Sequence, residues 1–181
     1  MRSGSRCRLG VVVAGLAGLL AACQDTAAPP APDAALAVAP APFVKRAGVS
    51  VADDTIALVS LDGAPESEAG DFRNALGRRF SAEGIVAADA RRARYLLRVY
   101  LAADPEPGGA SLDYVVDVFD HGRARQARLS DSFAVKGAGD AWSLMSSEAL
   151  DAAASACAEN VAAFLSNAPE AAPLQALSAG Q

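Results

Sequence analysis

Hydrophobic positions change their spacing along the chain, and each spacing predicts a different kind of element. The apolar run Thr55–Leu61 is rich in residues that favour strands. Residues 66–83 instead predict a helix, because apolar side chains recur there every three or four residues. These side chains are Ala69, Phe72, Leu76 and Phe80. Gly84 follows as a C-terminal cap.

The middle of the chain predicts further strands. Ile85–Ala88 is a short strand candidate, and alternating apolar and polar residues mark three longer segments. The longer segments are 94–102, 112–120 and 125–135. The EPGG sequence at 106–109 and the pair His121-Gly122 predict the turns of a three-stranded meander.

The alternation also predicts which side chains share a face of the sheet. In the segment 112–120 the inward side carries Leu112, Tyr114, Val116 and Val118. The outward side carries Asp113, Val115, Asp117 and Phe119. Arg125 and Arg128 of the next segment are placed to face these acids. Because acids and apolar side chains mix outside, we expect partial cover of this face.

The last helix is predicted to begin after Ser146, a favourable N-cap. Its apolar stripe is Leu150, Ala153, Ala154, Cys157, Val161, Phe164 and Leu165. The predicted order is β-α-β-β-β-β-α. Two amphipathic helices and one half-buried sheet predict a two-layer α+β sandwich, with a mostly antiparallel sheet and both helices packed on one face.

The first 22 residues have the pattern of an export signal. Residues 1–8 carry three arginines and no acid, and residues 9–20 form an apolar run of 12. That run is too short to span a bilayer, which needs about 20 residues. It is typical of a signal-peptide core.

The residues after that core, Leu20-Ala21-Ala22-Cys23, resemble the lipobox of bacterial lipoproteins, which signal peptidase II recognises. The resemblance implies that residues 1–22 are removed as a signal peptide. It also implies that Cys23 receives diacylglycerol and that the new amino terminus is acylated, for example by palmitate. One acyl chain, at about 0.8 kcal/mol per buried CH₂, anchors a protein only marginally, so several chains are needed.

The residue after the cysteine indicates a location. Gln24, rather than Asp, follows the cysteine, which favours the outer membrane with the protein facing the periplasm. The competing interpretation is an ordinary secretory signal that happens to contain a cysteine.

The composition divides the remaining chain into a tether, a domain and a tail. Residues 23–50 hold five prolines among alanines, which disfavours helix and sheet. As a polyproline spacer of about 3.1 Å per residue, this stretch would hold a domain several tens of ångströms from the membrane. We expect the folded domain at 51–166 and a disordered tail at 167–181.

The charge excludes some partners. The chain has 16 Lys+Arg and 21 Asp+Glu, a formal charge of −5. Removing residues 1–22 takes away Arg2, Arg6 and Arg8 and no acid, which leaves a charge near −8. Such a chain is a poor candidate for nucleic acid or for peripheral binding to anionic lipid.

Few residues are candidates for chemistry. His121 is the only histidine and there is no CxxC or HExxH motif, so we expect neither a metal site nor a cofactor. A hydrolase would have to use His121, or the outward pair Asp113 and Asp117 in the manner of a glycosidase. The favoured interpretation is that His121 is a turn residue and that the two acids are balanced by arginines. These arginines are Arg98, Arg125 and Arg128.

Two other side chains each have two interpretations, a structural one and a functional one. Cys157 lies on the apolar stripe of the last helix and is expected to be a small buried hydrophobe. Trp142, the only tryptophan, is either a lid on one end of the core or an aromatic anchor for a partner. It is the best single candidate for a partner contact.

The layout from Thr55 to Phe164 resembles small lipoproteins of the Gram-negative envelope. Examples are lipopolysaccharide-assembly lipoproteins such as LptE, and the lipoprotein activators of penicillin-binding proteins. The resemblance rests on the segment Ala88–Val99, on the turn Asp120-His121-Gly122 and on a terminal helix. It implies a non-catalytic protein that docks on another envelope component, and no binding residue is carried over from it.

The leading hypothesis is therefore a membrane-anchored periplasmic lipoprotein, a non-catalytic adaptor or assembly factor with an envelope protein as partner. A small-ligand or glycan-binding module is the alternative. It would need a pocket, and an aromatic content of 6% supplies few side chains to line one. A hydrolase is the third hypothesis.

Overall fold

The computed structural model describes residues 43–169 and 171–173. Its main elements are β2 (Ile56–Asp62), α1 (Glu66–Ala82), β3 (Tyr95–Glu106), β4 (Gly109–Asp120), β5 (Arg125–Lys136) and α2 (Ser147–Ser166). A short 3₁₀ turn, η2 (Trp142–Leu144), precedes α2, and β1 (Val49–Ser50) pairs with β6 (Ala172–Pro173). No helix of the described residues is long and apolar enough to cross a membrane.

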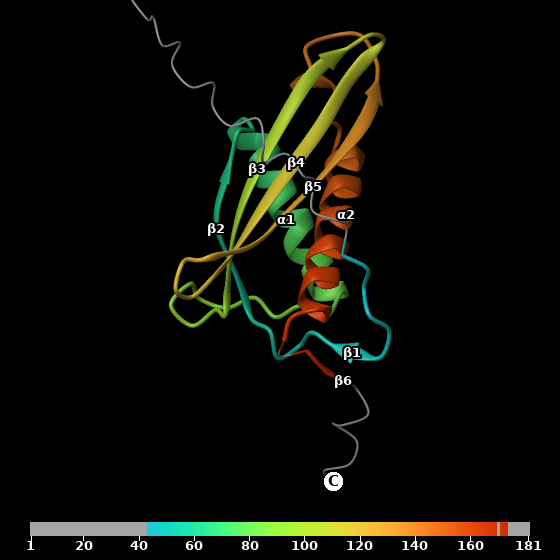
Figure 1. The fold of residues 1–181 in the computed structure, drawn as a ribbon. Coiled ribbons are helices and arrows are strands. Elements are labelled where there is room, and N and C mark those ends of the chain that lie inside the picture. The colour runs from blue at the N-terminus through green and yellow to red at the C-terminus, as the bar shows by residue number, and fades with distance from the viewer. Residues whose placement is uncertain (1–42, 170, 174–181) are drawn as a thin grey trace, which may run out of the picture. The chain divides into compact units, whose positions relative to one another are not determined.

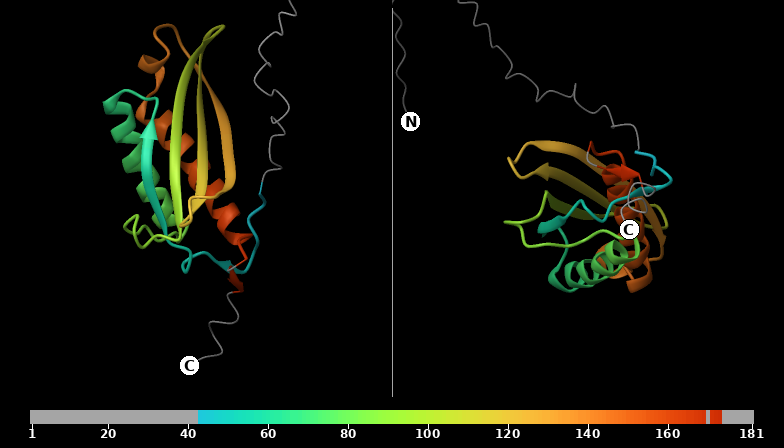
Figure 2. Two further views of the ribbon diagram at one scale, coloured as in Figure 1. Left: turned by 60° about the vertical axis from the view of Figure 1, so that its left-hand side comes forward. Right: turned by 90° about the horizontal axis from the view of Figure 1, so that it is seen from below.

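The main sheet has the strand order β2-β3-β4-β5. β2 and β3 are parallel and α1 connects them, whereas β3, β4 and β5 form an antiparallel meander. Both helices lie on the same side of this sheet (Figure 1), and the turned views show the other side uncovered by helix (Figure 2). The predicted two-layer α+β sandwich with a mostly antiparallel sheet is confirmed.

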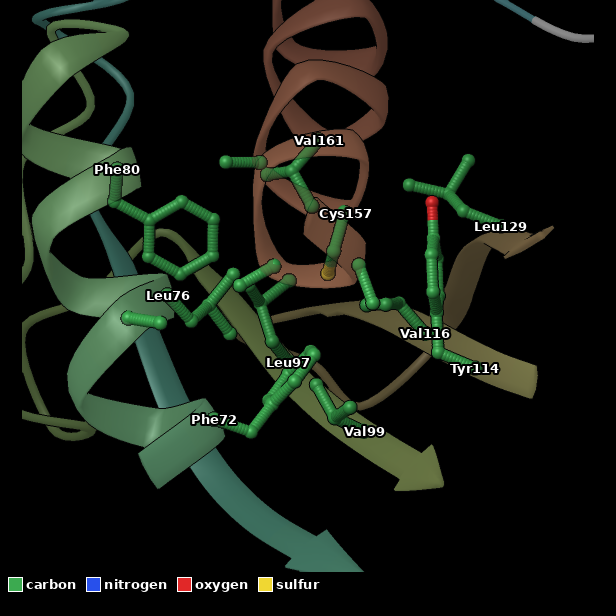
Figure 3. Close-up of a cluster of buried hydrophobic side chains, with 14 of the residues drawn as sticks. Phe72, Leu76, Phe80, Leu97, Val99, Tyr114, Val116, Leu129, Cys157 and Val161 are labelled. Atoms are coloured by element: carbon green, nitrogen blue, oxygen red, sulfur yellow. The ribbon is translucent and has the colours of Figure 1, made fainter. Parts of the chain in front are cut away.

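The core lies between the helices and the inward face of the sheet (Figure 3). Every second residue of β4 from Leu112 to Val118 is at most 1% exposed, as the alternation predicts. These residues are Leu112, Tyr114, Val116 and Val118. All seven residues of the predicted stripe on α2 are also buried. Five of the buried positions of α2 are alanines, and such small side chains let α2 approach its neighbours closely. They are Ala153, Ala154, Ala158, Ala162 and Ala163.

The helix ends follow the caps that the sequence predicts. Ser146 Oγ accepts a hydrogen bond of 3.3 Å from the Ala149 N–H. At the end of α1, Gly84 has a φ of +75° and donates to the Ser81 carbonyl, while Ile85 donates to the Phe80 carbonyl. This pair of bonds is the Schellman arrangement, which satisfies carbonyls that the helix leaves open.

The predicted strand Ile85–Ala88 is wrong, because the segment makes only an isolated parallel bridge between Ala87 and Ile56. The chain leaves the sheet directly afterwards. The Asp89 carboxylate accepts from the Arg91 N–H at 2.8 Å, and the Asp89 carbonyl accepts from two further amides. This turn ends the pairing after one residue.

The turn between β4 and β5 also differs from its prediction. Its left-handed residue is Arg123, with a φ of +66°, and not Gly122. Gly122 has a different role, since a Cβ there would lie 3.2 Å from Asp120 Oδ1. That oxygen accepts a hydrogen bond from the Ala124 N–H at 2.9 Å and so closes the turn.

Residues 43–50, assigned by composition to the tether, lie against the helical layer. The Phe43 ring meets the Phe164 ring edge to face, with 5.5 Å between centroids. Arg46 N–H donates to Ser166 Oγ at 3.0 Å. The predicted signal peptide 1–22 and the first part of the predicted tether lie outside the described residues.

Candidate docking surface on the open face of the sheet

The face of the sheet opposite the helices carries both charged and apolar side chains. No helix or strand of residues 43–169 and 171–173 packs on it. Among the same residues four large hydrophobic side chains are exposed, and two of them lie here: Val59 at 46% and Tyr100 at 38%. We call this surface the open face.

The open face contains a buried carboxylate that is bound by arginines. Asp117 is only 4% exposed, although it points away from the core. Arg128 donates to both of its oxygens at 2.8 Å, and Arg125 Nη1 lies 3.7 Å from Oδ1. The hydrogen bonds that Arg128 donates to Asp117 raise the pKa of Arg128 above its ordinary value. The predicted balance of outward acids by Arg125 and Arg128 is therefore found at Asp117.

Arg98 lies directly opposite Asp117 on β3 but does not pair with it. Its guanidinium carbon instead lies 5.6 Å from the centroid of the Phe119 ring. The reason is that Arg128 already occupies both oxygens of Asp117, whereas the ring on the diagonal position offers a cation–π contact. Among the described residues, Arg98 therefore has no carboxylate within ion-pair distance.

A groove of about 260 Å³ runs over this part of the open face. Its lining consists of Val59, Leu96, Arg98, Phe119 and Arg123. The residues come from β2, β3, β4 and the following turn, so the sheet register creates the groove. We call it the arginine groove: an apolar floor with two guanidinium groups.

Val59 contributes to this floor from β2. Because Leu58 pairs with the buried Leu97 and packs against the core, alternation places Val59 on the open face, beside Leu96 and Phe119. The pairing of β2 with β3 then shifts between Leu58 and Ser60, and this bulge turns Leu61 back toward the core opposite Val99. Leu96 and Phe119 are direct partners across β3 and β4.

The structure places the only histidine, His121, on an exposed turn. Its Nδ1 lies 3.3 Å from the Ala93 carbonyl oxygen. A neighbouring groove of about 330 Å³ is lined by Arg94, Tyr95, Asp120, His121, Gly122, Gln126 and Pro169. This lining contains no serine, threonine or cysteine that a histidine base could activate.

Asp113 and Asp117 share the outward face of β4, as predicted. Four residues along a strand separate their Cα atoms by roughly 13 Å. Asp113 accepts a hydrogen bond from Ser111 Oγ at 3.3 Å, and both oxygens of Asp117 are bound by Arg128. The two carboxylates are thus held apart by separate partners instead of facing one substrate position.

Cys157 and Trp142 differ in burial. Cys157 is fully buried among apolar side chains of the core, and burial raises the pKa of its thiol (Figure 3). A thiol in this setting stays protonated and is a poor nucleophile. Trp142 is half-buried against the edge of the core, and its backbone N–H donates to Asp140 Oδ1 at 3.1 Å.

The predicted lipidation site lies outside the described residues. This holds for Cys23 and for the residues that precede it, Leu20, Ala21 and Ala22. The arginine groove, in contrast, was not predicted from the sequence. The outward positions of Val115 and Phe119 were the available signal, because apolar residues on a solvent-facing strand side indicate an interaction surface.

Comparison with known proteins adds a limited likeness of fold. No family model matches the sequence, and no curated protein matches it. Two dodecameric PelC structures from Paraburkholderia phytofirmans resemble the chain at 10% identity, with TM-scores of 0.46 and 0.45. The matches cover 65% and 63% of this chain and 92% and 90% of those chains.

A minor lipoprotein from Acinetobacter baumannii is similar at 14% identity and a TM-score of 0.42. That match covers 61% of this chain and 94% of the other. Likeness at this level concerns chain layout, and no residue, ligand or partner is carried over from these proteins.

Proposed function

We propose that this chain is a lipid-anchored protein of the bacterial cell envelope, and that its domain is a non-catalytic adaptor or assembly factor. The lipid is attached to Cys23, and the domain docks on an envelope protein through the open face of its sheet. The observation that carries the docking proposal is this face, which leaves Val59 and Tyr100 exposed. Contiguous exposed apolar side chains with a polar rim are typical of protein interaction sites.

The anchor and the open face act together in this proposal. A domain on a short tether reaches a membrane partner at an effective concentration in the millimolar range, so a modest interface is sufficient. The outer membrane is the proposed location, since Gln24 follows the lipidated cysteine.

The proposed lipid anchor is tested by membrane fractionation of the Cys23→Ser variant. We expect the wild-type chain in the membrane fraction with a diacylglyceryl mass on its N-terminal cysteine, and the variant released with neither. Cys7→Ser is the matched control, because it removes a cysteine that the leader carries away. Unchanged membrane association of Cys23→Ser would refute the anchor.

Docking is tested by a photo-crosslinking amino acid placed at Tyr100 in cells. The control site is Asn74, which is exposed on α1 on the other side of the molecule. We expect one defined envelope protein to crosslink at position 100 and not at 74. Crosslinking at 74 alone would place the partner on the helical layer and refute docking through the open face.

A further inference from the structure

We propose that the arginine groove recognises an acidic segment of a partner protein, seating apolar side chains on its floor and carboxylates on Arg98 and Arg123. The proposal rests on the proposed docking function and names the chemistry of the partner. It depends on three observations: the uncompensated guanidinium groups, the apolar floor between them and the charge of the surrounding surface.

The two guanidinium groups are available to a partner. Arg98 is held by its contact with the Phe119 ring, and Arg123 lines the groove from the turn after β4. Both side chains are exposed, and neither has an ion-pair partner among residues 43–169 and 171–173. Guanidinium binds carboxylate through charge-assisted hydrogen bonds of defined geometry.

Positive charge is enriched around this groove. The mature chain is acidic, yet positions 91–128 hold seven of its 13 Lys and Arg residues against five of its 21 acids, a local charge of +2. They flank the start of β3, the end of β4 and the start of β5, which meet at one end of the sheet. An acidic partner is attracted to this end and repelled by the remaining surface, which fixes the orientation of docking.

The floor favours a protein segment over other anionic partners. Val59 and Leu96 are aliphatic, and the single ring, Phe119, is covered by Arg98. A glycan site would need an open aromatic platform or a set of neutral polar groups, neither of which lines this groove. A bilayer surface is broad and would not enter a concave groove that also has an apolar floor. A peptide presents leucine-sized and carboxylate side chains at neighbouring positions.

The test uses the whole chain, purified from the cell fraction that holds it, and labelled nine-residue peptides. The first peptide has Glu-Leu-Glu-Leu-Glu flanked by Gly-Ser at each end. The second replaces each Glu with Gln, and the third replaces each Leu with Gly. Fluorescence anisotropy at low salt is expected to show the first peptide binding, with the other two weaker by about tenfold.

The variants separate the groove from general charge. Arg98→Gln combined with Arg123→Gln is expected to weaken the first peptide by about tenfold. Arg73→Gln with Lys136→Gln makes the same change in net charge at two exposed positions away from the groove, and is expected to stay within about twofold of wild type. Asp117→Asn removes a carboxylate beside the groove and is expected to tighten binding.

Several results would overturn the proposal. These are no binding of the first peptide, undiminished binding by the Arg98 and Arg123 double variant, or equal binding of the peptide without leucine. Two more name other occupants. Phosphatidylglycerol vesicles that bind the Cys23→Ser chain through Arg98 and Arg123 would identify a lipid surface. Self-association that this double variant abolishes would identify a second copy of the chain.

The two proposals fail in different ways. If crosslinking from Tyr100 persists in the Arg98 and Arg123 double variant and the peptides do not bind, docking stands and acidic recognition falls. If the peptide binds as expected while no protein crosslinks at Tyr100, recognition of acidic segments by the groove is supported and the adaptor function is refuted.

Discussion

At the scale of single residues, the polar groups on the two faces of β4 have different surroundings. On the core side the Tyr114 hydroxyl is buried and accepts a hydrogen bond of 2.6 Å from Asn160 Nδ2. On the open side the Asp117 carboxylate is covered by Arg125 and Arg128, whose side chains remain about half exposed. The core bond stabilises the fold, whereas the outer cluster orders a surface and leaves Arg98 available.

Tyr114→Phe tests the core bond. The substitution removes the acceptor and leaves a half-buried amide of Asn160 without its partner, so we expect the free energy of unfolding to fall by about 1–2 kcal/mol. Tyr100→Phe is the matched control, because its hydroxyl lies on the open face, and we expect a change within about 0.5 kcal/mol. Urea unfolding measures both. Equal losses in the two variants would contradict the role of the Asn160 bond.

At the scale of elements, α1 combines a left-handed cap with a glycine in its interior. Gly84 has a φ of +75°, which costs any residue with a Cβ. Gly77 lies within α1, and a Cβ added there would meet nothing within 4 Å. The same substitution should therefore have opposite effects at the two positions.

We expect Gly84→Ala to lower the free energy of unfolding by about 1 kcal/mol, and Gly77→Ala to raise it by about 0.5–1 kcal/mol. Thermal and urea unfolding of the two variants measure the difference. Since the chemistry of the change is identical, a loss of stability in both would show that Gly77 is required for something other than helix formation.

The two helices are also joined by an ion cluster. Arg78 and Arg79 of α1 pair with Asp151 of α2. The hydrogen bond from Arg79 is the main cause of the lowered pKa of Asp151. Because the folded pKa is below the unfolded one, the stabilisation is present above about pH 4 and is lost as the pH falls through the folded value.

Asp151→Asn is therefore expected to be less stable than wild type at pH 7, with a gap that closes as the pH is lowered below about 4. The gap is expected to be small and to shrink in salt, since these groups are solvent-accessible. Urea unfolding at both pH values measures it, with Asp71→Asn on the exposed side of α1 as the control. A gap that does not change with pH would contradict the ion pair as its cause.

The elements also show how far the sequence predicts the fold. The period of two in β4 assigned Leu112, Val116 and their neighbours to the core correctly, because burial on one face leaves a direct record in the sequence. The segment 85–88 was mispredicted because its pairing depends on where the Asp89 turn takes the chain. Such a turn acts over three residues and leaves no periodicity.

The arginine groove could not be predicted for a related reason. Leu96 and Phe119 become neighbours only through the register of β3 and β4, and Val59 joins them through the pairing of β2 with β3. The pattern of a single strand does not record how it pairs with its neighbours. Arg98 was correctly placed outward, but its choice of Phe119 over Asp117 depends on Arg128 from a third strand.

At the scale of the whole molecule, the sheet has one face covered by the two helices and one open face. The helical layer completes the core, while the open face gathers exposed apolar side chains and part of the basic end of an acidic chain. A tether at Cys23 would keep this face near the membrane that holds its partner. In this proposal the anchor, the positive charge and the groove all serve docking on the same partner.

The most direct test of this account is photo-crosslinking from Tyr100 in cells, compared between the wild-type chain and Cys23→Ser. We expect one crosslinked envelope protein from the anchored chain, and a strong loss of that product when the anchor is removed and the effective concentration falls. A product of equal yield from both chains would show that the anchor does not deliver the domain. No product at position 100 beside a clear product at Asn74 would contradict docking through the open face.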